Sequence, residues 1–203
     1  MGAGHLTCKA NIISNGGNLL VQFKVIVFVV ASLGLAWVSW PSLRDFRSHG
    51  FYRFFAFESI LALVLLNLNY WFYEPFSIRQ IVSWLLLIIS LFLVIYGFQL
   101  LRIVGKPDSK RNEPSLVGIE KTTELVTVGA YRYIRHPLYS SLLFGAWGVF
   151  FKHPSWVGVC LAVITTFFLT MTAKIEEAEN IRFFGAAYQS YMKQTKMFIP
   201  FLF

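Results

Sequence analysis

Residues 129–151 are Gly-Ala-Tyr-Arg-Tyr-Ile-Arg-His-Pro-Leu-Tyr-Ser-Ser-Leu-Leu-Phe-Gly-Ala-Trp-Gly-Val-Phe-Phe, so a cluster of cations and aromatic residues is followed directly by an apolar segment. Proline is favoured in the first turn of a helix, where its missing N–H group would have no helical partner. Pro137 therefore predicts that a helix begins here with His136 as its cap. Charged groups are costly inside a membrane, so an Arg-His pair at the mouth of an apolar helix indicates a polar site at a membrane boundary.

The composition of the whole chain is that of an integral membrane protein. Hydrophobic residues make up 56% of the 203 residues and charged residues only 14%, and the mean hydropathy is +0.59. These values exclude an ordinary soluble domain. The formal net charge of +8 comes from Lys and Arg in short loops beside apolar runs, a pattern typical of membrane anchoring and not of nucleic-acid binding. The sequence predicts an all-α, polytopic membrane protein.

Five apolar segments are candidate membrane crossings, since a helix needs about 20 residues to span the hydrocarbon. The segments are 19–40, 54–72, 78–104, 138–151 and 155–173. The fourth is short, which predicts a tilted or re-entrant arm of a helical hairpin, and the last is expected to project beyond the membrane because no Pro or Gly ends it before Gly185. The predicted parts are an N-terminal tail (1–18), three transmembrane helices (19–104) and a C-terminal core (105–203).

Several residues inside these segments predict how the helices meet. Polar side chains in a span are expected to face other helices, and small residues allow close packing. The residues concerned are Glu58, Asn67 and Asn69 as inward-facing groups, Gly145 and Gly148 as a close-packing face, Thr165, Thr166, Thr170 and Thr172 as hydrogen-bonding groups, and Trp84 as an interfacial anchor.

The positive residues predict the orientation of the chain. With five crossings, most Lys and Arg residues fall on one side, in the loop 41–53, the segment 105–135 and the tail after Ala173. The opposite side has Lys9, Arg79 and Lys152. The positive-inside rule then places the N-terminus outside and the C-terminus in the cytoplasm. This topology brings residues 129–141 and the Glu176-Glu177 pair to the same cytoplasmic end.

The residues at this end can bind charged groups. A helix start can receive a carboxylate on its free N–H groups, and Arg135 offers a planar fork to the same kind of ligand. Glu176 and Glu177 can balance a bound cation or pair with Arg135. Each feature alone has a simpler interpretation, as a snorkelling anchor, an interfacial histidine or a solvated helix end. An aromatic belt is the simpler interpretation of Tyr131, Tyr133, Tyr139, Tyr188 and Tyr191. Their combination at one end favours a binding site.

The ordered set of motifs resembles the isoprenylcysteine carboxyl methyltransferase family of integral membrane enzymes. The set comprises residues 125–139, an apolar hairpin, Glu176-Glu177, the run 184–191 and Ile199-Pro200. The resemblance covers about residues 95–200. Phospholipid methyltransferases share a similar Arg-His-Pro-x-Tyr core and Glu pair. Many relatives have Gly where this chain has Ser141, which is also small.

The resemblance implies S-adenosylmethionine as methyl donor, S-adenosylhomocysteine as product and no metal. The implied cofactor-binding residues are Val126, Val128, Gly129, His136, Pro137, Tyr139, Glu176 and Glu177, with Arg135 and Glu176 nearest the transferred methyl group. The implied acceptor is lipidic, enters from the bilayer and is most plainly a prenylcysteine-type carboxylate. The segment 105–133 is the expected lid over the cofactor.

Two alternatives remain at this stage. One is methylation of a phospholipid amine, for which Arg135 is a poor partner because the headgroup is cationic. The other is a non-catalytic membrane scaffold or transporter subunit, in which the Arg and Glu residues seal the bundle. The natural acceptor and the oligomeric state are left open by the sequence.

Overall fold

A computed structural model of the chain describes residues 3–106 and 122–202, with side chains described from residue 18 onward. The described parts contain helices and no named strand, which confirms the predicted all-α class. The elements are α1 (Ala3–Leu43), α2 (His49–Asn67), η1 (Leu68–Tyr70), α3 (Ile78–Ile103), η3 (Gly129–Arg132), α4 (Pro137–Phe150), α5 (Trp156–Phe184) and α6 (Ala186–Gln194). Most of the predicted lid, residues 107–121, lies outside the described residues.

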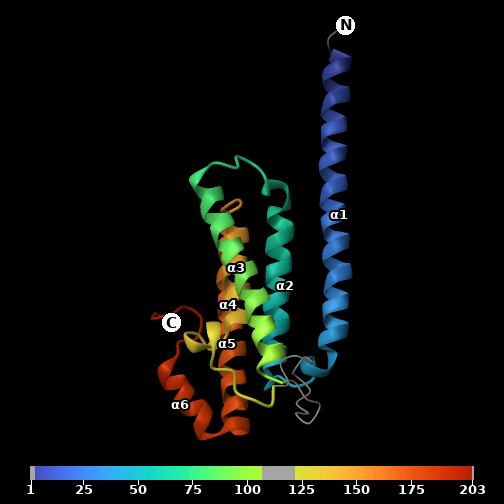
Figure 1. Ribbon diagram of the computed structural model, residues 1–203. Coiled ribbons are helices and arrows are strands. Elements are labelled where there is room, and N and C mark those ends of the chain that lie inside the picture. Colours follow the sequence, from blue (N-terminus) through green and yellow to red (C-terminus); the bar gives the residue numbers. More distant parts are fainter. Residues whose placement is uncertain (1–2, 107–121, 203) are drawn as a thin grey trace.

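Four helical stretches are long and apolar enough to cross a membrane. They are Asn18–Leu43 of α1, His49–Tyr70, α3 and α5. The fifth predicted crossing, α4, has 14 residues and forms the expected hairpin with α5. A polytopic membrane protein is therefore confirmed, whereas its sidedness stays a prediction. We call the end at which α1 and α5 finish and α2 starts the basic end; it is the lower end in Figure 1.

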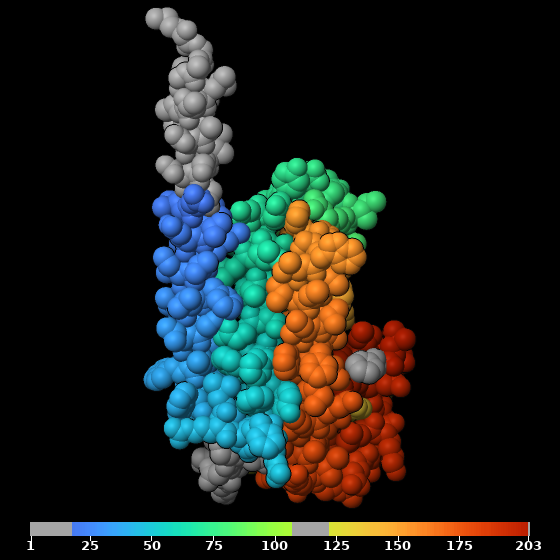
Figure 2. All heavy atoms as spheres, turned by 180° about the vertical axis from the view of Figure 1, so that it is seen from behind, coloured from blue at the N-terminus to red at the C-terminus, as the bar shows by residue number. Residues whose placement is uncertain are grey.

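The helices run roughly parallel or antiparallel to one another, with α1 beside α2 (Figure 1). Helix α3 packs mainly on α4, and α2 packs mainly on α5. Seen from behind, α1, α2 and α5 lie side by side (Figure 2). Two buried clusters fill the bundle, one around Tyr139, Leu169 and Phe198 and the other around Leu63 and Ala162. The first cluster supports the region that forms the pocket described below.

Helix ends follow their capping residues. Helix α2 starts at His49, five residues before the predicted start. The reason is a cap that sequence periodicity missed, because the Ser48 hydroxyl accepts the Gly50 N–H group. Helix α1 continues through the predicted tail to Ala3 and passes Pro41 to end at Leu43. In α5 the predicted end is confirmed, since Gly185 caps it with a φ of 61° that suits glycine.

Gly145 and Gly148 form a close-packing face, as predicted, and the structure shows that this face lies against α3. A methyl group on Gly148 would lie 3.0 Å from Leu87 Cγ, and one on Gly145 would lie 3.1 Å from Ser90 Oγ. The Ser90 hydroxyl donates to the Ser141 carbonyl at 2.7 Å. The missing side chains thus let α3 approach close enough for hydrogen bonds between helices.

The polar groups inside the spans behave in two ways. Asn67 is fully buried and donates from Nδ2 to the Val149 carbonyl at 3.0 Å, and Glu58 accepts from the Ser32 hydroxyl of α1 at 2.6 Å. Both confirm the expectation. The prediction for Asn69 is wrong, because it is exposed in η1 after α2 has ended.

The threonines of α5 are hydrogen-bonded within the bundle, as predicted, and their partners lie chiefly in their own helix. Each hydroxyl donates to the carbonyl four residues earlier, a common arrangement that satisfies the hydroxyl locally. The residues are Thr165, Thr166, Thr170 and Thr172. Thr166 also accepts Trp147 Nε1 of α4 at 3.2 Å, so one of the four does join the hairpin.

Candidate functional site

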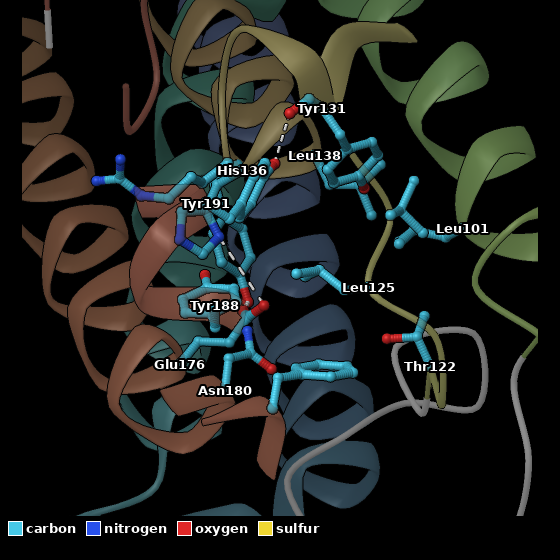
Figure 3. Close-up of a pocket in the computed structure, with 14 residues that line it drawn as sticks. Leu101, Thr122, Leu125, Tyr131, His136, Leu138, Glu176, Asn180, Tyr188 and Tyr191 are labelled. Carbon is cyan, nitrogen blue, oxygen red and sulfur yellow. Dashed lines mark hydrogen bonds and ion pairs between the residues drawn. The ribbon is translucent and has the colours of Figure 1, made fainter. Parts of the chain in front are cut away.

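A pocket opens at the basic end between α3, the segment before α4, α5 and α6 (Figure 3). Its cavity volume is about 70 Å³. The lining residues are Leu101, Thr122, Leu125, Val126, Tyr131, Arg135, His136, Leu138, Tyr139, Glu176, Asn180, Phe184, Tyr188 and Tyr191. The two sequence regions predicted to meet, 129–141 and Glu176-Glu177, do lie together here.

The chain's C-terminal segment holds the start of α4. The Arg135 N–H donates to the Lys196 carbonyl at 2.8 Å, the His136 N–H donates to the Met197 carbonyl at 3.2 Å, and the Lys196 N–H donates back to Tyr133. His136 is the helix cap with Pro137 next, as predicted. These two N–H groups are occupied by the chain itself. The predicted anion site therefore cannot use the N–H groups of Arg135 and His136, and Pro137 has none. Only N–H groups later in the first turn of α4 are left for an anion.

The Arg135 guanidinium donates three hydrogen bonds to other groups of the chain. Its Nε–H donates to Glu177 Oε1 at 2.6 Å, and Nη1 donates to the carbonyls of Met192 and Thr195. The Arg135 and Glu177 side chains are 10% and 9% exposed. The predicted pairing of Arg135 with a glutamate is confirmed for Glu177. Within the described residues, Nη2 is what remains of the guanidinium for a ligand.

His136 lies between the two glutamates. Its Nδ1 is 3.8 Å from Glu176 Oε1, and its Nε2 is 3.4 Å from Glu177 Oε1. The Tyr139 ring stacks on the imidazole with centroids 5.4 Å apart, and its hydroxyl donates to Glu176 Oε2 at 2.5 Å. The two carboxylates therefore differ in role, since Glu176 lines the pocket (Figure 3) and Glu177 is outside the lining and pairs with Arg135.

Tyr188 and Tyr191 share one face of α6, as predicted, and this face is buried. Their exposed fractions are 3% and 7%, and the Tyr191 hydroxyl donates to the Tyr131 carbonyl at 2.6 Å. Burial raises the pKa of both hydroxyls above the ordinary tyrosine value, so both stay neutral near pH 7. The aromatic-belt alternative is therefore wrong for the buried tyrosines, whereas Tyr133 is half-exposed.

The predicted site residues divide into two groups. Those that line the pocket are Val126, Arg135, His136, Tyr139 and Glu176. Those outside the lining are Val128, Gly129, Pro137 and Glu177. Gly129 shapes the wall from behind, with a φ of 61°, and a methyl group on this residue would lie only 2.6 Å from Tyr96 Oη, so a larger residue does not fit there. Contact of this second group with a cofactor stays a prediction.

Some pocket residues were missed from the sequence. Asn180 and Phe184 follow Glu176 at intervals of four residues, which places all three on one face of a helix. That spacing was the available signal. Leu101 gives no such signal, since it is one of many leucines in α3 and only the packing of α3 against the loop selects it.

Comparisons with known proteins converge on methyltransferases. The profile of a family described as phospholipid methyltransferase matches residues 78–187. The chain is 25% identical over 156 residues to a methanethiol S-methyltransferase of Pseudomonas deceptionensis, covering 68% of this chain and 56% of that protein. A methanethiol S-methyltransferase of Crocosphaera subtropica is 27% identical over 135 residues, or 64% of this chain and 47% of that protein.

A third relative is the protein-S-isoprenylcysteine O-methyltransferase of Schizosaccharomyces pombe. It is 33% identical over 95 residues, which cover 46% of this chain and 37% of that protein. The chain spans about half or less of the length of these curated relatives. No solved structure matches it.

Proposed function

Because this chain belongs to the phospholipid methyltransferase family, we propose that it transfers the methyl group of S-adenosylmethionine to an acceptor at the membrane. The isoprenylcysteine relative agrees with the resemblance found in the sequence, so that recognition is confirmed. The observation that supports the proposed chemistry best is the pocket itself. It joins His136 and Tyr139 of one helix start to Glu176 of another helix.

The polar groups of the pocket fit this cofactor. S-adenosylmethionine has an ammonium group, a sulfonium group and a purine. The Glu176 carboxylate suits either cation, and the Phe184 and Tyr188 rings, stacked with centroids 6.4 Å apart, offer apolar faces to a purine. The cavity of about 70 Å³ is smaller than a nucleoside, so binding requires its walls to move apart.

When bound, the cofactor supplies an electrophilic methyl group on its sulfonium sulfur. The residues of this chain bind the cofactor and the acceptor, orient them toward each other and exclude water. These are the main catalytic tasks in such a transfer. Tyr139 fixes the Glu176 carboxylate by its hydrogen bond. Since S-adenosylhomocysteine lacks the sulfonium charge, this carboxylate favours the donor over the product. Arg135 connects α5, through Glu177, to the start of α4 and to the carbonyls of Met192 in α6 and Thr195 just after it, and so holds the wall in place.

The acceptor we propose is lipidic, enters from the bilayer and is most directly a prenylcysteine-type carboxylate. Arg135 Nη2 is the group left to align that carboxylate, since a guanidinium matches its geometry.

A small thiol is a second candidate acceptor, because the two relatives named methanethiol S-methyltransferase align with more of the chain than the isoprenylcysteine enzyme does. A phospholipid amine is the third, from the family description. The positive loops favour a cytoplasmic pocket.

Titration calorimetry with S-adenosylmethionine in detergent tests the cofactor. We expect binding by the full chain, weakened about ten- to a hundred-fold by Glu176→Gln, which removes one charged interaction. Glu74→Gln is the matched control, because Glu74 pairs with Arg79 on the surface at the opposite end. Absence of binding at millimolar cofactor contradicts the proposal and favours a non-catalytic scaffold. Labelled cofactor, offered with a prenylcysteine analogue, methanethiol or a phospholipid amine, then identifies the acceptor.

A further inference from the structure

A second cavity lies at the basic end, on the other side of α5 from the pocket. It has a volume of about 760 Å³ and lies between the α1–α2 connection and the outer face of α5. Its charged lining residues are Asp45, Arg47, Lys174, Glu179 and Arg182. The two cavities share no lining residue, so this one is a site separate from the pocket of the proposed methyl transfer. The start of α2 and the adjoining α5 lie on the face shown in Figure 2.

Three cations line this cavity from two elements. Arg47 comes from the α1–α2 connection, and Lys174 and Arg182 come from α5, where their spacing of eight residues puts them about two turns apart on one face. All three are exposed. Across the described residues, none of the three forms an ion pair with a carboxylate. Their charges are therefore open to an anion.

Each of the two carboxylates that line the cavity has a hydrogen-bond partner within the chain. Asp45 Oδ1 accepts the Arg47 backbone N–H at 2.9 Å. Glu179 Oε2 lies 2.5 Å from Nδ1 of His49, which is fully buried, and the Glu179 side chain is only 15% exposed. Glu179 thus turns its charge toward the buried histidine. The open mouth of the cavity keeps a surplus of positive charge.

The surroundings of the cavity favour a lipid over a soluble anion. It lies where a candidate membrane span, Asn18–Leu43, ends and the next begins at His49, which is the level of lipid headgroups. Phe46 lines the cavity and exposes 64% of its surface, and Trp37 and Trp40, in the last two turns of α1, expose 80% and 56%. Aromatic residues are typical of this membrane level. An anionic headgroup in the cavity would leave its acyl chains to run along the apolar surface of α1.

From these observations we infer that the cavity binds the phosphate group of an anionic phospholipid, held by Arg47, Lys174 and Arg182. Arg is suited to grip phosphate oxygens with two N–H groups, and Lys adds a point charge. Phosphatidylglycerol has the required chemistry, with one net negative charge at the phosphodiester. Phosphatidylcholine has the same phosphodiester but an added cation, which the three basic side chains repel.

Calorimetric titration of the full chain in a neutral detergent tests this site. The probes are dioctanoyl phosphatidylglycerol, dioctanoyl phosphatidylcholine and inorganic phosphate. We expect saturable binding of one phosphatidylglycerol, and weakening of about 25-fold in a Lys174→Gln/Arg182→Gln variant, at about five-fold for each basic residue near a membrane surface. An Arg47→Gln variant should lose about five-fold.

The matched control is Lys193→Gln/Lys196→Gln, which removes two exposed cations of the same end outside this cavity. It should bind phosphatidylglycerol like the wild type. Equal binding of both lipids, equal loss in the control, or inorganic phosphate binding as tightly as the lipid would each overturn the inference. The substituted side chains are exposed, so unfolding temperatures without lipid should match the wild type and show that the variants are folded.

Discussion

Among the described residues, a largely buried Arg or Lys lies at each end of the bundle, and the two charges are balanced in different ways. At the basic end, Arg135 is paired with the carboxylate of Glu177. At the opposite end, fully buried Lys152 donates to Gln80 Oε1 at 3.0 Å, and its Nζ lies 3.4 Å from the centroid of the Trp84 ring. Neutral dipoles and ring faces thus replace the carboxylate. Burial lowers the pKa of Lys152 to about 8.

This difference indicates which end is built for ligands. An ion pair beside an open pocket, with a second carboxylate on the wall, holds charges that a ligand can contact. At the Lys152 end, the polar groups are buried and bonded to one another between α3 and the α4–α5 turn. Its Trp84 was predicted to be an interfacial anchor, yet it covers the lysine. Three experiments separate the two ends, from the largest expected effect to the smallest.

Glu177→Gln should produce the largest loss of stability. Removing one partner of a buried ion pair leaves the other charge uncompensated, which costs about 3–5 kcal/mol of unfolding free energy. Arg135 and His136 both lie beside this carboxylate. The measurement is denaturant unfolding in detergent. Glu74→Gln, at an ion pair whose side chains are 58% and 25% exposed, should cost less than about 1 kcal/mol. Similar losses in the two variants would show that Arg135 does not depend on its carboxylate.

Lys152→Met should change how stability depends on pH. The amine releases its proton near pH 8 in the folded protein and near its ordinary value of 10.5 when unfolded. Between these values the unfolded chain binds more protons, so stability rises with pH, by up to about 1.4 kcal/mol per pH unit. The variant should lack this rise while keeping its affinity for the methyl donor.

The useful pH range for that measurement is 8 to 10. Tyr188 and Tyr191 have a raised pKa in the folded protein, so they contribute stability that is present below about pH 10 and lost above it. Their effect is opposite in sign and would mask the lysine at higher pH. A wild-type curve that is flat from pH 8 to 10 would mean that the aromatic rings keep Lys152 charged.

Tyr139→Phe should have the smallest effect of the three substitutions. It removes the hydroxyl that donates to Glu176 Oε2 but keeps the ring that stacks on His136. One hydrogen bond to a charged group of this kind is worth about 1.5 kcal/mol or more. We expect affinity for S-adenosylmethionine to fall about ten-fold in calorimetry, and the unfolding free energy to fall by about 1.5 kcal/mol, because the hydrogen bond is also present in the unliganded protein. An unchanged affinity would remove Tyr139 from the positioning of Glu176.

Much of the fold followed from local signals. Apolar length predicted α3 and α5, and Pro137 predicted the start of α4. Local signals failed where a single side chain fixes the start of a helix, as the Ser48 cap does for α2. They predicted that the threonines of α5 form hydrogen bonds but did not identify the acceptors, which are carbonyl groups of the same helix.

The candidate site was predicted only in part, because its geometry depends on packing. Glu176 and Glu177 are adjacent and chemically alike, yet neighbouring residues of a helix point about 100° apart. The packing of α5 against α4 turned Glu177 to Arg135 and Glu176 to the pocket. Residues 196 and 197 also accept hydrogen bonds from the start of α4. These bonds join parts of the chain about 60 residues apart, so local sequence signals could not predict them.

The sequence by itself determined the membrane class, the helices and the end of the bundle where polar chemistry gathers. Hydrophobicity, proline and capping residues act over one or two helical turns, so their effects can be read locally. Only the tertiary structure decided which carboxylate faces a ligand, which cation is sealed behind tryptophans and where three exposed cations meet in a second cavity. Those outcomes depend on the rotation of each helix about its axis, which is set by the neighbours against which it packs.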